Sequence, residues 1–249
     1  MRVIVGLIAL LVATSPASAA EIKTLITTAM EAAIVELVPP FERATGHKVT
    51  VSYDPSGGLA RRLRNGEFAD MILIASSELD KLIGEGKVKD RTDVSRTGIA
   101  LAVRKGAPHP DVSTPEALKR ALIAAKSIGH TAPAGGGITA LHIQKVFERL
   151  GIAEQVTPKV TLAAGGPNGR VSVLVASGKA EIGLQQLSEL SSNPDVEVIG
   201  LLPDELQQIT INSAGITAIA KEPDAARALI KQLTSPEAVA LYKTKGLGL

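Results

Sequence analysis

Short apolar runs alternate with amphipathic stretches along most of the chain, and this alternation limits the possible folds more than any other sequence feature. Near the start the order is strand, helix, strand, helix, strand, at residues 21–27, 30–46, 48–54, 57–67 and 70–76. This βαβαβ order is typical of an α/β fold with a parallel sheet. Later strands are predicted at 96–106, 180–186, 196–202 and 208–220, and later helices after Thr114, at 140–151, at 169–179 and twice within 222–246.

The first twenty residues carry the pattern of a secretory signal peptide. Arg2 precedes an apolar run over residues 3–13, which is too short to span a membrane, and small residues at 17–19 form an A-x-A cleavage site. We therefore expect residues 1–20 to be removed and the mature chain to work in the bacterial periplasm. No later stretch offers the roughly 20 apolar residues of a spanning helix.

Composition narrows the classes of ligand. The chain has no cysteine, which excludes disulfide bonds and thiolate metal sites, so the fold depends on its own core. The 27 basic and 25 acidic residues are mixed along the sequence, and the aromatic residues are three Phe and two Tyr. A nucleic-acid groove needs clustered cations and stacking rings, so we expect no nucleic-acid partner. A ligand held by hydrogen bonds is favoured instead.

Four segments share one order, in which a strand ends, small or hydroxyl residues follow, and a helix begins. They lie at 27–31, 54–62, 134–142 and 163–173, and the third contains the three consecutive glycines of TAPAGGGITA. Free N–H groups and the helix dipole make a helix start an anion site. We interpret the missing side chains as room for main-chain N–H groups to approach a bound anion. Ordinary helix caps are the alternative.

Motifs for catalysis or metal binding are weak. The stretch GGPNGRVS lacks the Gly-Lys-Ser/Thr ending of a phosphate loop, no G-x-S-x-G is present, and the four histidines lack ligand spacing. Ser56, His130 and Asp70 could compose a triad, but so could residues of most proteins. We therefore expect no enzyme activity, no metal and no cofactor. His130 could donate to an anion, and Arg96 or Arg170 could clamp a carboxylate.

Five segments of the sequence resemble those of a known family, and the resemblance spans essentially the whole mature chain. They are FERATGHKVTVSYDPSGGLARRLRNGEFADMILIAS, VFERLGI, VASGKAEIGLQQLSEL, VIGLLPDELQQ and LTSPEAVALYKTKGL, in this order. The sequence resembles the periplasmic molybdate-binding proteins of ABC transporters, within the two-lobed type II periplasmic binding proteins. The resemblance implies an α/β fold of two lobes with mostly parallel sheets, a small anionic ligand in the cleft, hinge closure and an inner-membrane ABC permease as partner.

The resemblance also implies which residues hold the ligand. The family uses two serine-type hydroxyls, N–H groups at two helix starts and a tyrosine. Ser56 matches one serine, the other position is Ala29, and the tyrosine position carries Gln186, so two of the hydroxyl donors that hold molybdate in the family are replaced here. The candidate ligand-binding residues are Thr28, Ala29, Ser56, Gly57, Gly136, Gly137, Ile138, Thr139, Asn168, Arg170 and Gln186.

We thus predict a monomeric receptor whose first lobe comprises residues 21–98 and 208–249, and whose second comprises 99–207. It captures a molybdate-like oxyanion and delivers it to a permease. Three alternatives stay open at this point. One is a receptor whose ligand is an organic di- or tricarboxylate. The second is a secreted hydrolase or transferase that reuses the fold, and the third is a ligand sensor.

Overall fold

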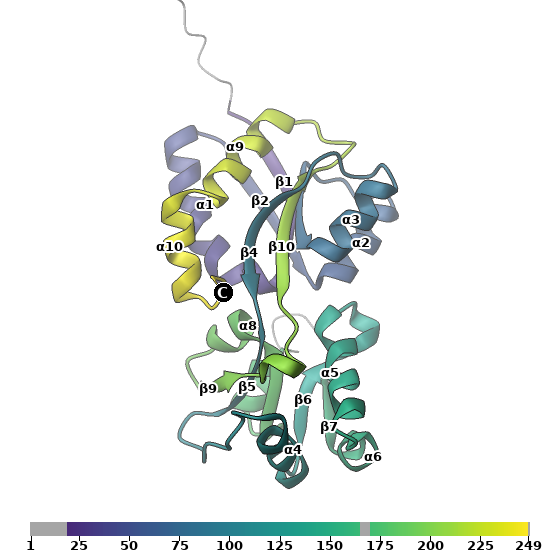
Figure 1. Cartoon of the computed structure of the whole chain (residues 1–249). Coiled ribbons are helices and arrows are strands. Elements are labelled where there is room, and N and C mark those ends of the chain that lie inside the picture. The colour runs from purple at the N-terminus through teal and green to yellow at the C-terminus, as the bar shows by residue number, and fades with distance from the viewer. Residues whose placement is uncertain (1–18, 165–169, 249) are drawn as a thin grey trace, which may run out of the picture.

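Two five-stranded sheets, one in each lobe, organise the chain (Figure 1). The computed structural model describes residues 19–164 and 170–248. The strands of lobe 1 are β1 (Glu21–Thr27), β2 (Lys48–Asp54), β3 (Met71–Ala75), β4 (Thr92–Thr97) and β10 (Thr210–Ile216), in the order β2-β1-β3-β10-β4. Those of lobe 2 are β5 (Ile99–Arg104), β6 (Ile128–Thr131), β7 (Val160–Ala163), β8 (Ile182–Gln186) and β9 (Val196–Leu201), in the order β7-β6-β8-β5-β9.

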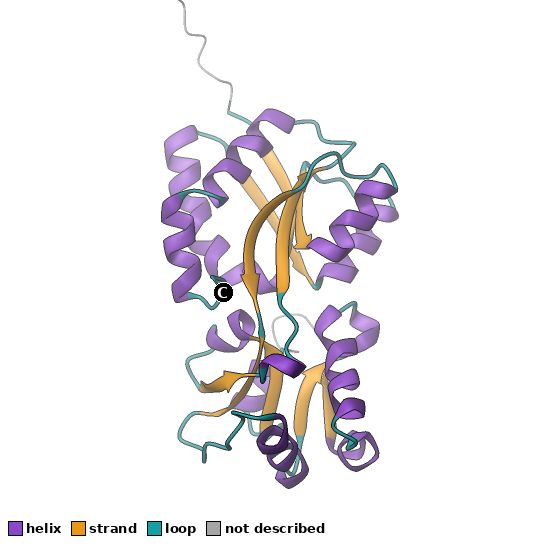
Figure 2. Cartoon of the chain, viewed as in Figure 1, coloured by secondary structure: helices purple, strands orange, loops and turns teal. Residues whose placement is uncertain are grey.

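Helices cover the faces of both sheets, as the purple ribbons of Figure 2 show. Lobe 1 contributes α1 (Glu31–Thr45), α2 (Ser56–Arg64), α3 (Ser76–Gly84), α9 (Pro223–Leu233) and α10 (Pro236–Thr244). Lobe 2 contributes α4 (Pro115–Ala124), α5 (Ile138–Arg149), α6 (Ala153–Val156), α7 (Val171–Ala176) and α8 (Leu187–Ser191). Short 3₁₀ turns lie at η1 (Thr28–Met30), η2 (Pro133–Gly135), η3 (Thr157–Lys159) and η4 (Asp204–Leu206). Among the described residues, no helix has both the length and the apolar character needed to cross a membrane.

Both sheets are mostly parallel, and each contains one reversed strand. In lobe 1, β10 runs antiparallel to both of its neighbours, β3 and β4. In lobe 2, β5 does the same between β8 and β9. The remaining pairs, β1 with β2 and β3, and β6 with β7 and β8, are parallel. The α/β architecture predicted from the alternating pattern is confirmed.

The chain crosses between the lobes twice, and the crossings are joined by one side chain. The first crossing is at Gly98 between β4 and β5, and the second spans 202–209 between β9 and β10. The Gln207 amide accepts a hydrogen bond from Ile99 N at 2.8 Å and donates to Ile99 O at 3.0 Å. Lobe boundaries at 98/99 and 207/208 remain our proposal.

The single strand predicted over 96–106 is wrong in one respect. The structure has two strands there, β4 and β5, which belong to different sheets. Only Gly98 separates them along the chain, so the sequence pattern is that of one strand. The two strands are distinguished by their pairing partners. β4 pairs with β10 in lobe 1, and β5 pairs with β8 and β9 in lobe 2.

Each lobe has its own apolar core, which fixes the sheet against its helices. In lobe 1, α1 buries Ile34, Leu37 and Phe41 against the sheet. In lobe 2, Phe147 of α5 and Leu118 of α4 pack in the equivalent core. Burying such side chains contributes roughly 1.5–3 kcal/mol each, so each lobe is held without disulfides. The strand ends that face the other lobe are thereby kept in fixed positions.

Candidate functional site

A small pocket lies between the lobes, at the carboxyl ends of parallel strands, where open α/β sheets bind ligands. Its cavity volume is about 40 Å³. Lobe 1 lines this interlobe pocket with Thr27, Thr28, Pro55 and Ser56. Lobe 2 lines it with Thr131, Gly137, Ile138, Thr139, Arg170, Val171, Ser172, Gln185, Gln186 and Glu189.

The hydroxyls of lobe 1 are already hydrogen-bonded within the protein. The Ser56 hydroxyl donates to Thr27 Oγ1 at 3.2 Å and accepts from Ala75 N at 3.0 Å. It therefore ties together the ends of β1 and β3 and the start of α2. The Thr28 hydroxyl donates to Glu189 Oε1, across the lobes, at 2.9 Å. Ser56 and Thr28 thus offer a bound anion fewer free protons than their positions alone suggest.

Lobe 2 supplies a row of glutamine amides and threonine hydroxyls. Gln185 Nε2 donates to Thr131 Oγ1, and Gln186 Nε2 donates to Thr139 Oγ1 at 3.3 Å. Each threonine hydroxyl accepts in these bonds, which leaves its own proton available for a ligand oxygen. The first N–H groups of α5, near Ile138, add donors because a helix start has no partners for them within the helix. These groups form a donor surface on one side of the pocket.

Arg170 places a positive charge in the interlobe pocket. Its Nη2 donates to Glu31 Oε2 of α1, so the ion pair also connects the lobes. Its Nε is buried and has no hydrogen-bond partner among the described residues. A buried donor without a partner costs about 1–3 kcal/mol, which a ligand oxygen would recover.

Among the described residues that line the interlobe pocket, only Glu189 carries a carboxylate. Burial of its carboxyl raises the pKa of Glu189 to about 7, while the hydrogen bond from Thr28 and the charge of Arg170 oppose the shift. Nearby Glu31 adds to the rise in the pKa of Glu189. A carboxyl with such a pKa can both give and take a proton near neutral pH.

The raised pKa predicts a pH-dependent stability difference for Glu189→Gln. Below about pH 4 the carboxyl is protonated in both the folded and the unfolded state, and wild type and variant differ little. As the pH rises from the ordinary pKa toward 7, the unfolded state releases its proton and the folded state retains it, so wild type loses stability. We expect the variant to be more stable than wild type by on the order of 1–3 kcal/mol at pH 8.

Urea denaturation of both proteins at pH 4, 6 and 8 measures this difference. The exposed Glu154→Gln substitution is the matched control. A stability difference between wild type and Glu189→Gln that is the same at all three pH values would contradict the prediction.

Two glycines bring the main chains of the lobes into direct contact. Gly57 N donates to Gly136 O at 3.1 Å. Gly136 has φ +82°, and a Cβ there would lie 2.6 Å from Gly58 N. The glycine-rich segment was expected to let N–H groups approach an anion. Gly137 does line the pocket, but Gly136 serves the approach of one lobe to the other.

The structure brings together most of the sequence-predicted site residues. Those that line the interlobe pocket are Thr28, Ser56, Gly137, Ile138, Thr139, Arg170 and Gln186. Ala29 is buried in η1, and Gly57 and Gly136 lie in the contact between lobes. Asn168 falls outside the described residues.

The other candidates lie elsewhere. His130 is buried against Phe147, with Nδ1 2.9 Å from Thr131 O, and is not among the pocket residues. Arg96 is exposed on β4. Asp70, at the far end of β3, accepts hydrogen bonds from the N–H groups of Lys23, Lys221 and Glu222. The triad composed from Ser56, His130 and Asp70 is therefore not assembled.

Sequence reasoning missed Thr131, Gln185 and Glu189 in the pocket, and Glu31 beside it. The first two close buried strands, and Glu189 lies in the helix that follows β8. An acidic side chain in the first turn of a helix is a common stabiliser, so its sequence position carries no signal of a site. Polar residues at the end of an apolar strand were the available signal for Gln185.

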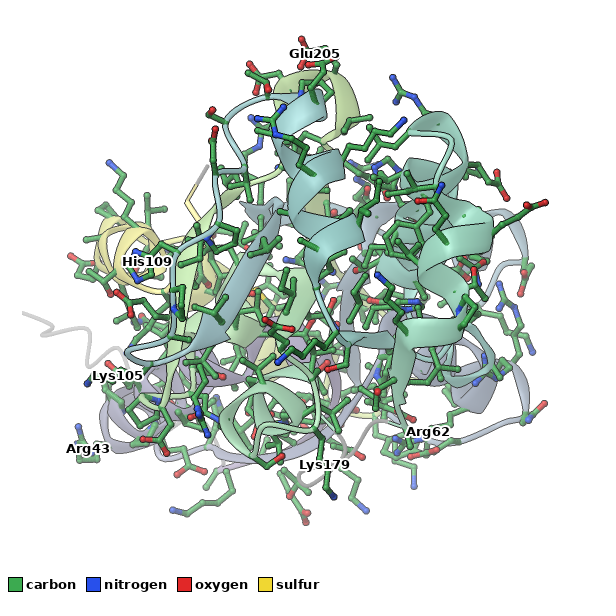
Figure 3. All side chains as sticks on the ribbon, turned by 90° about the horizontal axis from the view of Figure 1, so that it is seen from below. Arg43, Arg62, Lys105, His109, Lys179 and Glu205 are labelled. Carbon is green, nitrogen blue, oxygen red and sulfur yellow. The ribbon has the colours of Figure 1, made fainter. Side chains whose placement is uncertain are left out.

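Figure 3 shows Arg43, Arg62, Lys105 and Lys179 at separate places around the periphery. Within residues 19–164 and 170–248, no group of three or more His, Cys, Asp or Glu side chains could hold a metal ion.

Comparisons with known proteins place this geometry in a family. The profile described as "Bacterial extracellular solute-binding protein" matches residues 22–248. A protein named aconitate isomerase, from Pseudomonas sp, is 36% identical over 251 residues, which cover 96% of this chain and 93% of the relative. The molybdate-binding protein ModA of Azotobacter vinelandii is 28% identical over 253 residues, which cover 100% of this chain and 97% of the relative.

Solved structures agree on the fold. The periplasmic molybdate-binding protein of Azotobacter vinelandii superposes with a TM-score of 0.76 at 20% identity, covering 92% of this chain and 99% of that one. The fold is thus that of the type II periplasmic binding proteins. The chain belongs to the bacterial extracellular solute-binding protein family, as a divergent relative of the molybdate-binding proteins of ABC transporters.

Proposed function

We propose that this chain is a periplasmic receptor that captures a small polycarboxylate between its lobes and delivers it to an ABC permease. The observation that carries the proposal is Arg170, which lines the interlobe pocket and whose buried Nε has no hydrogen-bond partner among the described residues. A planar guanidinium matches the two oxygens of a carboxylate. The donor row of lobe 2 supplies the remaining hydrogen bonds.

Capture works by closure. A ligand that bonds to Arg170 and α5 of lobe 2, and that touches Thr28 of lobe 1, has more contacts when the lobes are closed, so its binding favours that state. No covalent bond is formed, and reopening at the permease releases the ligand unchanged. The Pseudomonas relative, whose name refers to aconitate, a tricarboxylate, supports this ligand class.

A second candidate function is isomerisation of an unsaturated polycarboxylate, and Glu189 is the observation that favours it. A base takes a proton from a methylene carbon next to a carbon–carbon double bond. The double bond then moves by one position, and the proton is returned to the carbon at its far end, so atoms and charge balance. Glu189 can hold that proton near neutral pH, and Arg170 can stabilise the negative charge of the intermediate.

Titration calorimetry with a panel of anions tests the first function. We expect tricarballylate, citrate and the aconitates to bind, and molybdate, tungstate, sulfate and phosphate to bind at least about 100-fold more weakly. Tight binding of molybdate with no binding of carboxylates would overturn the polycarboxylate proposal and favour the oxyanion. Proton NMR of cis-aconitate incubated with the protein tests the second function, since formation of trans-aconitate is visible directly, and a Glu189→Gln variant should abolish it.

A further inference from the structure

A second pocket adjoins the interlobe pocket and shares two of its wall residues, Thr28 and Arg170. This side pocket has a cavity volume of about 400 Å³. It lies between the first turns of α1, the short helix α8 and the end of α10, and Figure 1 shows α8 directly below the end of α10. Its other lining residues are Glu31, Ala32, Val35, Ser188, Ser191, Ser192, Thr244 and Lys245.

The two pockets differ in cavity volume. A water molecule needs roughly 10–15 Å³ of cavity volume, so the interlobe pocket, at about 40 Å³, has room for roughly three water-sized groups. One carboxylate group, with its carbon and two oxygens, is of this size. A six-carbon tricarboxylate is not, and its remaining groups must extend beyond the interlobe pocket. The side pocket is the adjoining space, and it shares Thr28 and Arg170 with the interlobe pocket as lining residues.

The side pocket contains an unsatisfied hydroxyl. Ser188 lines this pocket and is only 2% exposed. Its hydroxyl has no hydrogen-bond partner within the described part of the chain. Leaving a buried hydroxyl without a partner is unfavourable, and a ligand oxygen in the side pocket would supply the missing partner.

Lys245 supplies a positive charge on the same wall. Its Nζ is 2.6 Å from Glu36 Oε1, and the Glu36 side chain is 51% exposed. An ion pair with such an exposed partner contributes little to stability, so exchanging Glu36 for a ligand carboxylate costs little. The carboxylate of Glu31 also lines this pocket, but it is bonded to Arg170.

We propose that the side pocket is a subsite for a second, terminal carboxylate of a polycarboxylate whose other end lies in the interlobe pocket, with Lys245 and Ser188 as its donors. This inference rests on the proposed polycarboxylate function and extends it. Arg170, which lines both pockets, lies between the two carboxylates. The arrangement selects ligands by the distance between their charged groups, which a site for one tetrahedral oxyanion does not do.

Two probes that differ by one terminal carboxylate test the subsite. Tricarballylate has three carboxylates, and methylsuccinate is the same molecule with one terminal carboxylate replaced by hydrogen. We expect Lys245→Met to weaken tricarballylate binding about 10-fold and to change methylsuccinate binding by no more than about twofold. Ser188→Ala should act in the same direction with a smaller effect, because it removes one neutral hydrogen bond.

Lys243→Met is the matched control, because it removes one charge from the last turn of α10, two residues before Lys245, at an exposed position outside the side pocket. It should leave the affinity for both probes unchanged. Equal effects of Lys245→Met on both probes, or no effect on either, would overturn the subsite while the polycarboxylate function stands. If wild type binds neither probe nor any other carboxylate of the panel, the proposed function fails, and the subsite fails with it.

Discussion

Replacing Arg170 with methionine is expected to weaken tricarballylate binding by about 100-fold or more. Truncating one partner of a buried, hydrogen-bonded charge pair costs about 2–5 kcal/mol. Methionine retains much of the length of the arginine side chain, so the packing at the start of α7 changes little. Titration calorimetry at pH 7.5, where carboxylate probes are ionised, measures the loss.

The Glu31 carboxylate complicates this result, since the substitution leaves it without Arg170. The double variant Glu31→Gln, Arg170→Met removes that unpaired charge. If the double variant still binds tricarballylate more weakly than the single variant Glu31→Gln does, the difference reports the contact between Arg170 and the ligand. Arg96→Met, which alters an exposed arginine outside the interlobe pocket, is the control and should bind as wild type does. Unchanged affinity in Arg170→Met would remove the central observation of the proposed function.

Under the proposed function, Arg170 would also couple ligand binding to lobe closure. Its Nη2 bonds to Glu31 of lobe 1, while its Nε is buried and has no hydrogen-bond partner among the described residues. A ligand carboxylate bonded to the Arg170 guanidinium would fix the orientation of the guanidinium. It would thereby favour the ion pair between Arg170 and Glu31, which connects the lobes. One side chain can therefore serve both the ligand and the closed state, which is the differential affinity that closure requires.

Local sequence patterns sufficed for much of the fold. The strands predicted at 21–27 and 48–54 agree with β1 and β2, because apolar alternation and flanking helix signals are local features. The four-residue strands β6 and β7 were not predicted, since so short a run has no measurable period. The division between β4 and β5 depends on which strands pair across the sheets, and no local pattern encodes that choice.

The candidate site shows the same division between local and non-local information. Thr28, Ser56 and the start of α5 were found because strand ends and helix starts are visible in the sequence. Glu189 was not found, because its raised pKa comes from burial and its bond to Thr28 joins residues of different lobes. The ion pair of Glu31 with Arg170 likewise joins residues 139 positions apart. Contacts between lobes are set by closure, which the sequence does not display.

Replacing Gly136 with alanine is expected to lower ligand affinity by about 10- to 100-fold through the closed state. A Cβ at this position would lie 2.6 Å from Gly58 N and 2.8 Å from Gly57 C, both main-chain atoms of lobe 1. Overpacking of this kind costs typically about 1–3 kcal/mol, and the cost is avoided when the lobes stand apart. Calorimetry with tricarballylate measures the affinity, and small-angle X-ray scattering of the ligand-free protein should give a larger radius of gyration than wild type.

Backbone strain must be separated from this clash, because alanine at φ +82° is strained whatever surrounds it. Gly106 provides the control, since it has φ +77° and a Cβ there meets no atom within 4 Å. Gly106→Ala should lower the stability of the fold without changing ligand affinity or lobe separation. If both alanine variants bind tricarballylate equally well, the contact between Gly57 and Gly136 does not control closure. If only Gly136→Ala loses affinity, the absence of a side chain at Gly136, in the segment 134–142, is explained by the approach of the two main chains.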